Sequence, residues 1–335
     1  MANANPSRSG LREGNADAIE LFRDVFTGEV MTAFEKQVSL KDKHQVRTTT
    51  HGKSISFPAT FKVGSRRHVP GTEITGQTVP HNEVIITIDD QLIADVFVAN
   101  IDELMNHYDV RAPYSQEIGR ELALQYDRGV ARMLTLAARG GALFTNDQGG
   151  SQLANAAYAT NGNTLIDGIA DAKLTMDEKD VPVEVQPVYS VLKPAQFSLI
   201  GRVDKSINRD FGGGGSTKRM VLETVDGVMV HKSNAVPFGR DETLYNATTN
   251  VDGLIDNPSD PNAIPAADLP AKYYGDWTNT IGLVWTPWAA GTAQLLDITM
   301  GIDYDPRRLG TLMVGRYVVG HGTLRNKCAV ELATA

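Results

Sequence analysis

The stretch that decides the fold is PYSQEIGRELALQYDRGVARMLTLAARGG, residues 113–141. It predicts one long amphipathic helix, because its apolar residues recur every three or four positions. Ser115 is expected to cap the N-terminus of this helix, and Gly140-Gly141 is expected to end it. A helix of about 25 residues is a rod of roughly 37 Å, long enough to be a spine on which other elements pack. The apolar stripe consists of Ile118, Leu122, Tyr126, Val130, Met133, Leu134 and Ala137.

Upstream of the long helix, the sequence predicts an extended two-stranded hairpin. Apolar residues alternate in ISFPATFKV (55–63), and EVIITIDDQLIADVFV (83–98) supplies two more strand-like runs. Pro58 restricts the first strand to the edge of a sheet. The tip carries Arg66 and Arg67. A lone hairpin with one apolar face is marginally stable in water, so we expect another surface to cover it.

The rest of the chain mixes helical and strand patterns. ADAIELFRDVFTGEVMTAFEKQV (16–38) has helical spacing around Phe22 and Phe26, and Gly28 is expected to divide it into two short helices. The pattern as a whole predicts an α+β fold. The other expected elements are helices at 100–110, 163–180 and 195–211, a strand within 183–192, strands around a turn at Asp226-Gly227, and a β-rich segment from Thr280 onward.

Composition is that of a folded protein. The chain has 335 residues, of which 41% are hydrophobic and 21% are charged. Its single cysteine, Cys328, excludes an internal disulfide and favours a reducing compartment. No apolar run approaches the roughly 20 residues that a membrane-spanning helix needs.

Charge is distributed unevenly along the chain. The net charge of −8 argues against broad nucleic-acid binding. Residues 1–70 hold 11 Lys/Arg against 7 Asp/Glu, whereas residues 241–276 hold 7 Asp/Glu against one lysine. Such segments would suit contact between copies of the chain, although solvated surfaces are often uneven too. The acid pairs Asp89-Asp90 and Asp102-Glu103 are expected to be solvated.

One glycine-rich stretch invites an enzymatic interpretation. DFGGGGSTKRM (210–220) resembles a phosphate-binding loop, but that motif requires Ser or Thr directly after the lysine. Here Arg219 follows Lys218, and the hydroxyls of Ser216 and Thr217 precede it. We therefore favour a mobile connector over a nucleotide site.

Other catalytic or metal-binding motifs are missing. The seven histidines form no HExxH pair or Cys/His cluster, and there is no GxSxG elbow. His107 and Asp109 are too few for a metal site, and packing or capping is the expected role. His321 and Cys328 are poor candidates for a thiol nucleophile pair. We therefore expect no enzyme activity, no metal and no cofactor.

The remaining motifs carry a family resemblance. FTGEVMTAF (26–34), GKSISFP (52–58), VIITIDDQLIADVFV (84–98, with one inserted Ile), IDELMNHYDVR (101–111) and YVVGHGTLR (317–325) occur in the order found in one family. By these motifs the chain resembles the major capsid protein of short-tailed phages of the T-seven group, which has the Hong Kong 97 fold. MNHYDVR and GHGTLR are the most specific, and residues 144–280 match only in element order.

The resemblance implies a division of the chain into four regions. Residues 1–50 would be an N-terminal arm, and residues 51–90 an extended loop that lies over a neighbouring subunit. Residues 91–159 and 281–335 would form a peripheral domain, with the spine helix at about 115–139. Residues 160–280 would form an axial α/β domain around five- and six-fold axes, and the glycine-rich stretch would be one of its loops.

The resemblance also implies a function. The chain would self-assemble into an icosahedral head around double-stranded DNA, with pentamers and hexamers of itself, a scaffolding protein and a portal as partners. It would touch DNA weakly and non-specifically, assemble in the cytoplasm of a bacterial host and end in the virion. Lys53 and Lys62 lie in the hairpin, but no isopeptide cross-link is expected. The expected subunit-interface residues are Phe57, Phe61, Arg66 and Arg67 of the extended loop and Phe22 and Phe26 of the arm, with the arginines meeting acidic residues of a neighbour.

Two alternatives stay open from the sequence. A cellular nanocompartment shell of the same fold would enclose cargo enzymes instead of a genome. A nucleotide-using enzyme is argued only from the glycine-rich stretch.

Overall fold

The computed structural model describes residues 20–60, 65–74, 76, 81–99, 111–142, 147–203, 224–239, 241–242 and 270–334. Several predicted features lie outside these residues. They are the helix at 100–110, the acid pair Asp102-Glu103, the pair His107 and Asp109, the glycine-rich stretch at 210–220, Phe61 and Lys62.

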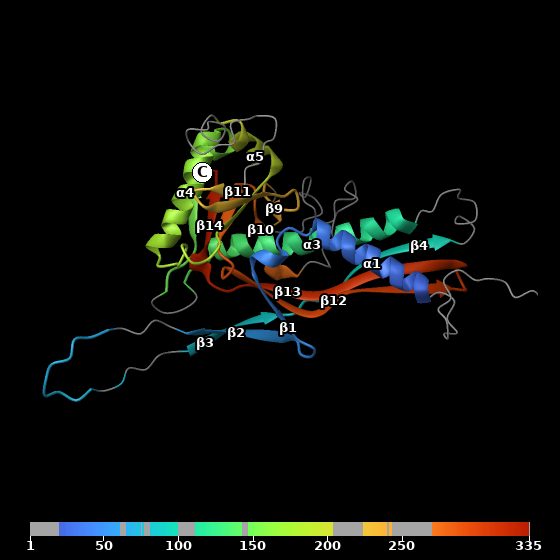
Figure 1. Ribbon diagram of the computed structural model, residues 1–335, viewed down its shortest axis with the longest axis horizontal. Helices are drawn as coiled ribbons and strands as arrows, with labels where there is room; N and C mark the ends of the chain where they lie inside the picture. Colours follow the sequence, from blue (N-terminus) through green and yellow to red (C-terminus); the bar gives the residue numbers. More distant parts are fainter. Residues whose placement is uncertain are drawn as a thin grey trace, which may run out of the picture.

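The long amphipathic stretch forms the helix α3 (Arg111–Arg139), which runs along the body of the molecule (Figure 1). It begins before the predicted cap. Ser115 is buried inside the helix, and its hydroxyl donates to Glu29 Oε2 at 3.0 Å. The N-cap prediction is therefore wrong, because the helix already begins at Arg111, four residues before this serine.

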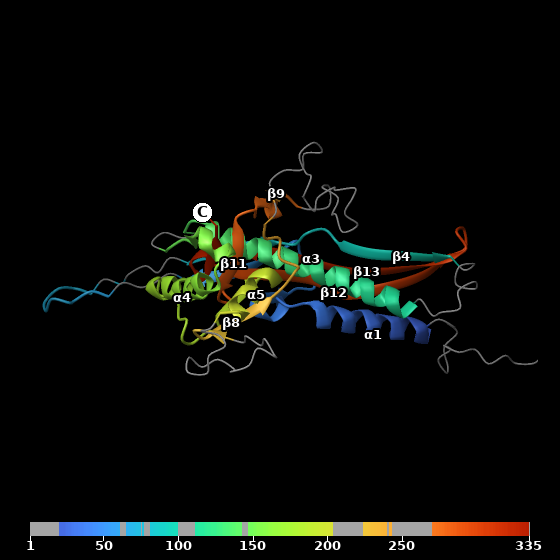
Figure 2. The same ribbon diagram turned by 90° about the horizontal axis from the view of Figure 1, so that it is seen from above.

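That neighbour is the helix α1 (Glu20–Gln37), which lies alongside α3 in both views (Figures 1 and 2). It is one helix, so the predicted break at Gly28 is wrong. A glycine inside a helix costs about 1 kcal/mol relative to alanine. Val30 and Phe34, which are buried in the main core, offset that cost.

The helix α3 covers one face of a four-stranded sheet. The strand order is β1-β12-β13-β4, with β1 parallel to β12 and the other pairs antiparallel. Alternate residues of β4 pack against the main core: Leu92, Ala94, Val96 and Val98. The strands are β1 (Gln45–Thr48), β4 (Leu92–Ala99), β12 (Ala290–Asp305) and β13 (Gly310–Thr323).

A second sheet has six strands, in the order β5-β14-β11-β6-β8-β7. The helices α4 (Gly162–Glu178) and α5 (Pro194–Gly201) belong to this part, and the helix predicted at 163–180 is confirmed. The predicted turn at Asp226-Gly227 is confirmed too, with φ of 49° and 77°, as a tight hairpin turn requires. The strands are β5 (Ser151–Ala154), β6 (Tyr189–Leu192), β7 (Thr224–Val225), β8 (Val228–Lys232), β11 (Thr280–Trp285) and β14 (Ala329–Ala333), and a separate pair is β9 (Asp241–Glu242) with β10 (Gly275–Asp276).

The predicted hairpin consists of β2 (Ser54–Thr60) and β3 (His81–Thr87), paired antiparallel. It projects from one end of the body, away from the tip of the β12–β13 hairpin (Figure 1). The third strand-like run, at 92–98, is β4 and belongs to the four-stranded sheet. Its assignment to the hairpin was wrong, because the alternating pattern predicts a strand but does not say which strand it pairs with.

Candidate assembly surfaces

The tip of the hairpin is exposed. Arg66 and Arg67 lie there, beside Val69 and Ile74, whose exposed fractions are 64% and 72%. The tip stands clear of the body of the molecule (Figure 1). It therefore presents both cations and apolar surface at the end of a long projection.

Phe57, in contrast, is buried within its own subunit. It is 7% exposed and packs in a small cluster with Ile86, Ala293 and Leu324. The guanidinium of Arg47 lies over its ring, 4.9 Å from the centroid. Phe57 therefore has little surface left for a neighbour, and it seats the hairpin on the body instead.

Phe22 and Phe26 lie on the first turns of α1, and their side chains are outside the described residues. Their predicted role stays a prediction. Phe34, further along α1, is buried and makes edge contacts with Tyr126 and Tyr317 at centroid distances of 6.1 Å and 6.5 Å. Such contacts contribute about 0.5–1.5 kcal/mol each beyond area burial.

A third surface was missed in the sequence. Ile93 and Phe97 of β4 are 56% and 40% exposed, on the face of the four-stranded sheet opposite α3. The half-buried Leu312 lies opposite Phe97, and Val314 is next to it on the same face. We call these four residues the open face. The sequence carried no signal for it, because exposed and half-buried residues alternate along 92–97 only in the folded chain.

The segment that follows α1 is bound firmly to α3. Asp127, which is 2% exposed, accepts hydrogen bonds from Ser39 N at 2.9 Å, Ser39 Oγ at 2.7 Å and Leu40 N at 3.0 Å. Burial raises the pKa of Asp127, and these hydrogen bonds counteract that rise. The indole of Trp285 donates to Lys43 O at 2.9 Å. The arm is therefore tied to α3 and to the six-stranded sheet before it enters β1.

The base of the hairpin crosses β13 at two glycines. A Cβ atom at Gly320 would clash with the carbonyl oxygen of Thr87, and one at Gly322 would meet Ile86 Cγ1 at 2.9 Å. Only glycine leaves room for this crossing. Residues 312, 314, 320 and 322 share one face of β13. The hairpin base covers this face at Gly320 and Gly322, and the open face is its other end.

Asp89, at the end of the hairpin, is bound by other protein groups. The prediction that it is solvated is therefore wrong. Its carboxylate accepts from the hydroxyl of Tyr273 and pairs with Lys272 Nζ at 2.6 Å. Its backbone N–H donates to Val319 O at 3.2 Å. These contacts join the hairpin to the segment 270–274. A sequence pattern could not show them, since the partners are about 180 residues away.

Behind this crossing, two buried histidines share one hydroxyl. His44 Nε2 lies 2.7 Å from Thr292 Oγ1, which lies 2.8 Å from His321 Nδ1. Burial lowers the pKa of His44 to about 4 and lowers the pKa of His321 well below 6.5. Both rings are therefore neutral near pH 7.

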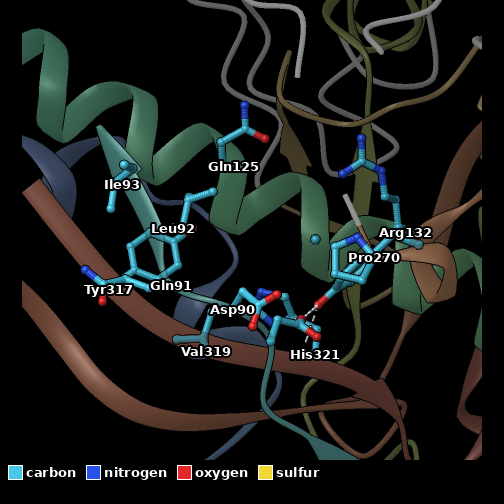
Figure 3. Close-up of a pocket in the computed structure, with 13 residues that line it drawn as sticks. Asp90, Gln91, Leu92, Ile93, Gln125, Arg132, Pro270, Tyr317, Val319 and His321 are labelled. Atoms are coloured by element: carbon cyan, nitrogen blue, oxygen red, sulfur yellow. Dashed lines mark hydrogen bonds between the residues drawn. The ribbon is translucent and has the colours of Figure 1, made fainter. Parts of the chain in front are cut away.

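A cavity of about 440 Å³ lies beside the crossing (Figure 3). It is lined by residues 89–93, by Gln125, Gly129 and Arg132 of α3, by Pro270 and Tyr273, and by Tyr317, Val319 and His321 of β13. The lining joins acidic, cationic and apolar groups. Among the lining residues that the structure describes, there is no serine, threonine or cysteine that could act as a nucleophile.

Candidate catalytic and metal-binding groups are not brought together. Burial raises the pKa of Cys328, the opposite of what an activated thiol needs, and His321 bonds Thr292 instead. Among the described residues, no three His, Cys, Asp or Glu side chains converge as metal ligands. No helix among the described residues is long and apolar enough to span a bilayer.

Comparisons of the sequence and of the structure with known proteins both find phage capsid proteins. The family model for Gp10A-like major capsid proteins matches residues 56–333. The major capsid protein of Escherichia phage T7 is 26% identical over 327 residues, covering 93% of this chain and 91% of that protein. The capsid structure of the cyanophage P-SCSP1u has a TM-score of 0.74 at 34% identity, covering 100% of this chain and 99% of that chain.

A more distant capsid shares the fold. The mature capsid of bacteriophage PhiM1 has a TM-score of 0.68 at 15% identity, covering 89% of this chain and 87% of that chain. The α+β fold predicted from the sequence is confirmed as the Hong Kong 97 type. The chain belongs to the Gp10A-like family of major capsid proteins, and it is a structural subunit of a phage head.

Proposed function

We propose that each subunit lays its extended hairpin across the open face of a neighbouring copy, and that this contact, repeated around five- and six-fold axes, builds an icosahedral head around double-stranded DNA. The observation that carries this proposal is that one chain exposes apolar side chains at two separate places, the second of them around the exposed Asp95 and Arg316. Val69 and Ile74 are exposed at the hairpin tip, and Ile93 and Phe97 are exposed on the open face. The hairpin points away from β4 (Figure 1), so it does not cover the open face of its own subunit.

The energetics suit a shell of many copies. Full burial of a Val, Ile or Phe side chain contributes about 1.5–3 kcal/mol, so one such contact is modest. Every subunit takes part in several contacts, and multivalency makes the closed shell stable. Arg66 and Arg67 would add specificity by meeting acidic residues of the neighbour, and Phe61, Phe22 and Phe26 would add apolar area.

The remaining regions are assigned by the same proposal. Residues 1–50 are the arm, 51–90 the extended loop, 91–159 and 281–335 the peripheral domain, and 160–280 the axial domain. The six-stranded sheet with α4 and α5 supports an axial unit, and α3 with the four-stranded sheet supports a peripheral one. The net charge of −8 supports weak, non-specific contact with the packaged DNA.

A scaffolding protein and a portal complete the proposed set of partners. Assembly takes place in the cytoplasm of the bacterial host, which fits a chain whose single cysteine is an unpaired, buried thiol. Family membership favours the phage head over a cellular nanocompartment. The nucleotide-using enzyme requires a nucleotide to bind, and a titration with labelled ATP that gives no signal excludes it.

The open face provides the test. In the double variant Ile93→Asp and Phe97→Asp, a charged pair would have to be buried under the neighbour's hairpin, so shells should not form. The matched control, Ile93→Val with Phe97→Leu, keeps the face apolar and should assemble. Sedimentation velocity and electron microscopy measure the yield of shells, and circular dichroism checks that the subunits remain folded.

A folded aspartate variant that yields shells as well as the control does would contradict the proposed docking. It would leave the family assignment intact, because that assignment rests on the comparisons.

A further inference from the structure

The Gly320-His321-Gly322 triplet of β13 faces two directions. The two glycines admit the hairpin base on one face, and strand alternation turns His321 to the other face. There a Cβ atom at Gly129 of α3 would meet His321 Cδ2 at 2.5 Å. The imidazole therefore lies directly behind the crossing, pressed against the helix.

A hydrogen bond to a backbone carbonyl defines the tautomer of His44 in the buried chain. His44 Nδ1 lies 2.8 Å from Leu40 O, and a carbonyl only accepts, so Nδ1 carries the hydrogen. The Nε2 atom of neutral His44 is then an acceptor, and the hydroxyls of Thr292 at 2.7 Å and Tyr126 at 3.3 Å can donate to it. Thr292 Oγ1 in turn accepts from the Nδ1–H of His321. With both rings neutral, each of these contacts pairs one donor with one acceptor.

A further proton breaks this order. Protonation of His44 turns Nε2 from an acceptor into a donor, so the Thr292 hydroxyl loses the group that accepts its hydrogen. The new charge would be fully buried, where ionised groups are strongly disfavoured. The charged and titratable groups around the two rings are Asp42 from the arm, Tyr126 and Arg132 from α3, Lys272 and Tyr273 from the segment 270–274, and Asp89 through Tyr273.

The chain reaches the hairpin through Tyr273. The backbone N–H of His321 donates to Tyr273 Oη at 3.1 Å, and the Tyr273 hydroxyl donates to Asp89 at the end of the hairpin. On its other side the chain reaches the arm through Leu40, whose N–H is bound by Asp127. The arm and the hairpin base are thus joined by one buried path.

We infer that the His44–Thr292–His321 chain is an acid-sensitive clamp, and that its protonation releases the arm segment and the hairpin base together. His44 and His321 are positioning residues in this proposal, since they act on the hairpin through Thr292, Tyr273 and Asp89. The inference rests on contacts within one subunit, so it does not depend on the proposed docking between copies.

The expected pH window follows from the histidine pKa values. In the open state the histidine pKa is 6.5, whereas in the closed state the pKa of His44 is about 4. Because the closed-state pKa is the lower one, the clamp is fully stable above pH 6.5 and weakens as the pH falls toward 4. For His44 alone, the opening equilibrium rises about twenty-fold between pH 7 and pH 5.

Hydrogen exchange of the full chain, measured by mass spectrometry and corrected for intrinsic rates, tests this clamp. Between pH 7 and pH 5, protection in peptides covering 38–48 and 84–92 should fall about twenty-fold or more, together. Protection in α4 should change little. In His44→Gln the side chain cannot titrate, so the pH dependence of both peptides should shrink by about that factor. The matched control is His51→Gln, which replaces an exposed histidine and should leave the protection profile unchanged.

A flat protection profile at both segments from pH 7 to pH 5 would overturn the inference, as would a His44→Gln profile identical to that of the wild type. If the glutamine variant does not fold, the wild-type profile decides. Protection lost at only one of the two segments would refute their coupling.

Discussion

At the scale of single residues, the most demanding burial is that of a carboxylate. Glu331 of β14 is fully buried, and the guanidinium of Arg139 binds it with two hydrogen bonds of 2.7 Å and 2.6 Å. Thr280 and Gln152 donate to the same carboxylate at 2.5 Å and 2.7 Å. Because every oxygen is satisfied, this charge is tolerated in the core. It ties the end of α3 to the six-stranded sheet.

Neutralising this carboxylate should therefore destabilise the subunit. We expect Glu331→Gln to lower the free energy of unfolding by about 3 kcal/mol, because Arg139 loses its counter-charge and faces an amide. Urea denaturation of the purified chain measures the change. The control Glu117→Gln removes an exposed pair with Arg120, whose side chains are 68% and 52% exposed, and should have little effect. Equal effects of the two substitutions would contradict this account.

Residue roles were the least predictable from the sequence. Phe57 belongs to an alternating strand, and the alternation correctly placed it on an apolar face. The pattern could not show that the same subunit covers that face through Ala293 and Leu324. Asp89 likewise gave no local signal, since its partners Lys272 and Tyr273 come from a distant segment. Local patterns predict that a side chain is buried, and only the folded chain shows what buries it.

At the scale of elements, the crossing of the hairpin over β13 sets how the molecule extends. The carbonyl of Thr87 lies against Gly320, and the side chain of Ile86 lies against Gly322. The crossing leaves the open face of the same sheet uncovered. The direction of the hairpin therefore depends on the absence of two side chains.

A single methyl group at the crossing should displace the hairpin. In Gly320→Ala, the added Cβ would clash with the backbone oxygen of Thr87, so the base of the hairpin must move or the strand must distort. We expect the free energy of unfolding to fall by about 1–3 kcal/mol and the yield of shells to be lower. Thermal unfolding and electron microscopy measure the two effects.

The chain offers a matched control for this substitution. At Gly301, on the neighbouring strand β12, an added Cβ would meet no described atom within 4 Å, so Gly301→Ala should be neutral. If Gly320→Ala unfolds and assembles like Gly301→Ala, the crossing is not as tight as described.

Helices and strands with a regular repeat of apolar residues could be predicted from the sequence. The pairing of strands with distant neighbours could not. The helices at 113–141 and 163–180 were predicted because an apolar stripe requires no knowledge of its partner. The run at 92–98 was recognised as a strand and assigned to the wrong sheet. A period of two identifies a half-buried strand, but its neighbour β13 lies more than 200 residues away. The continuity of α1 through Gly28 was missed for a related reason, since packing on α3 outweighs local propensity.

At the scale of the whole molecule, the account depends on surfaces that one copy cannot cover. The hairpin tip extends from one end of the body, and the open face lies toward the other end (Figures 1 and 2). The family resemblance in the sequence predicted a shell subunit, and the comparisons confirm it. The open face itself could not be predicted, because it exists only once α3 has covered the opposite side of the sheet.

The most direct test is a single-particle electron microscopy map of shells assembled from the full chain, at a resolution that shows side chains. We predict that the hairpin of each subunit leaves its own body beyond the crossing at Gly320, and that its tip lies on Ile93 and Phe97 of the adjacent copy. A map in which each hairpin folds back on its own subunit, leaving the open face bare in the closed shell, would contradict the account.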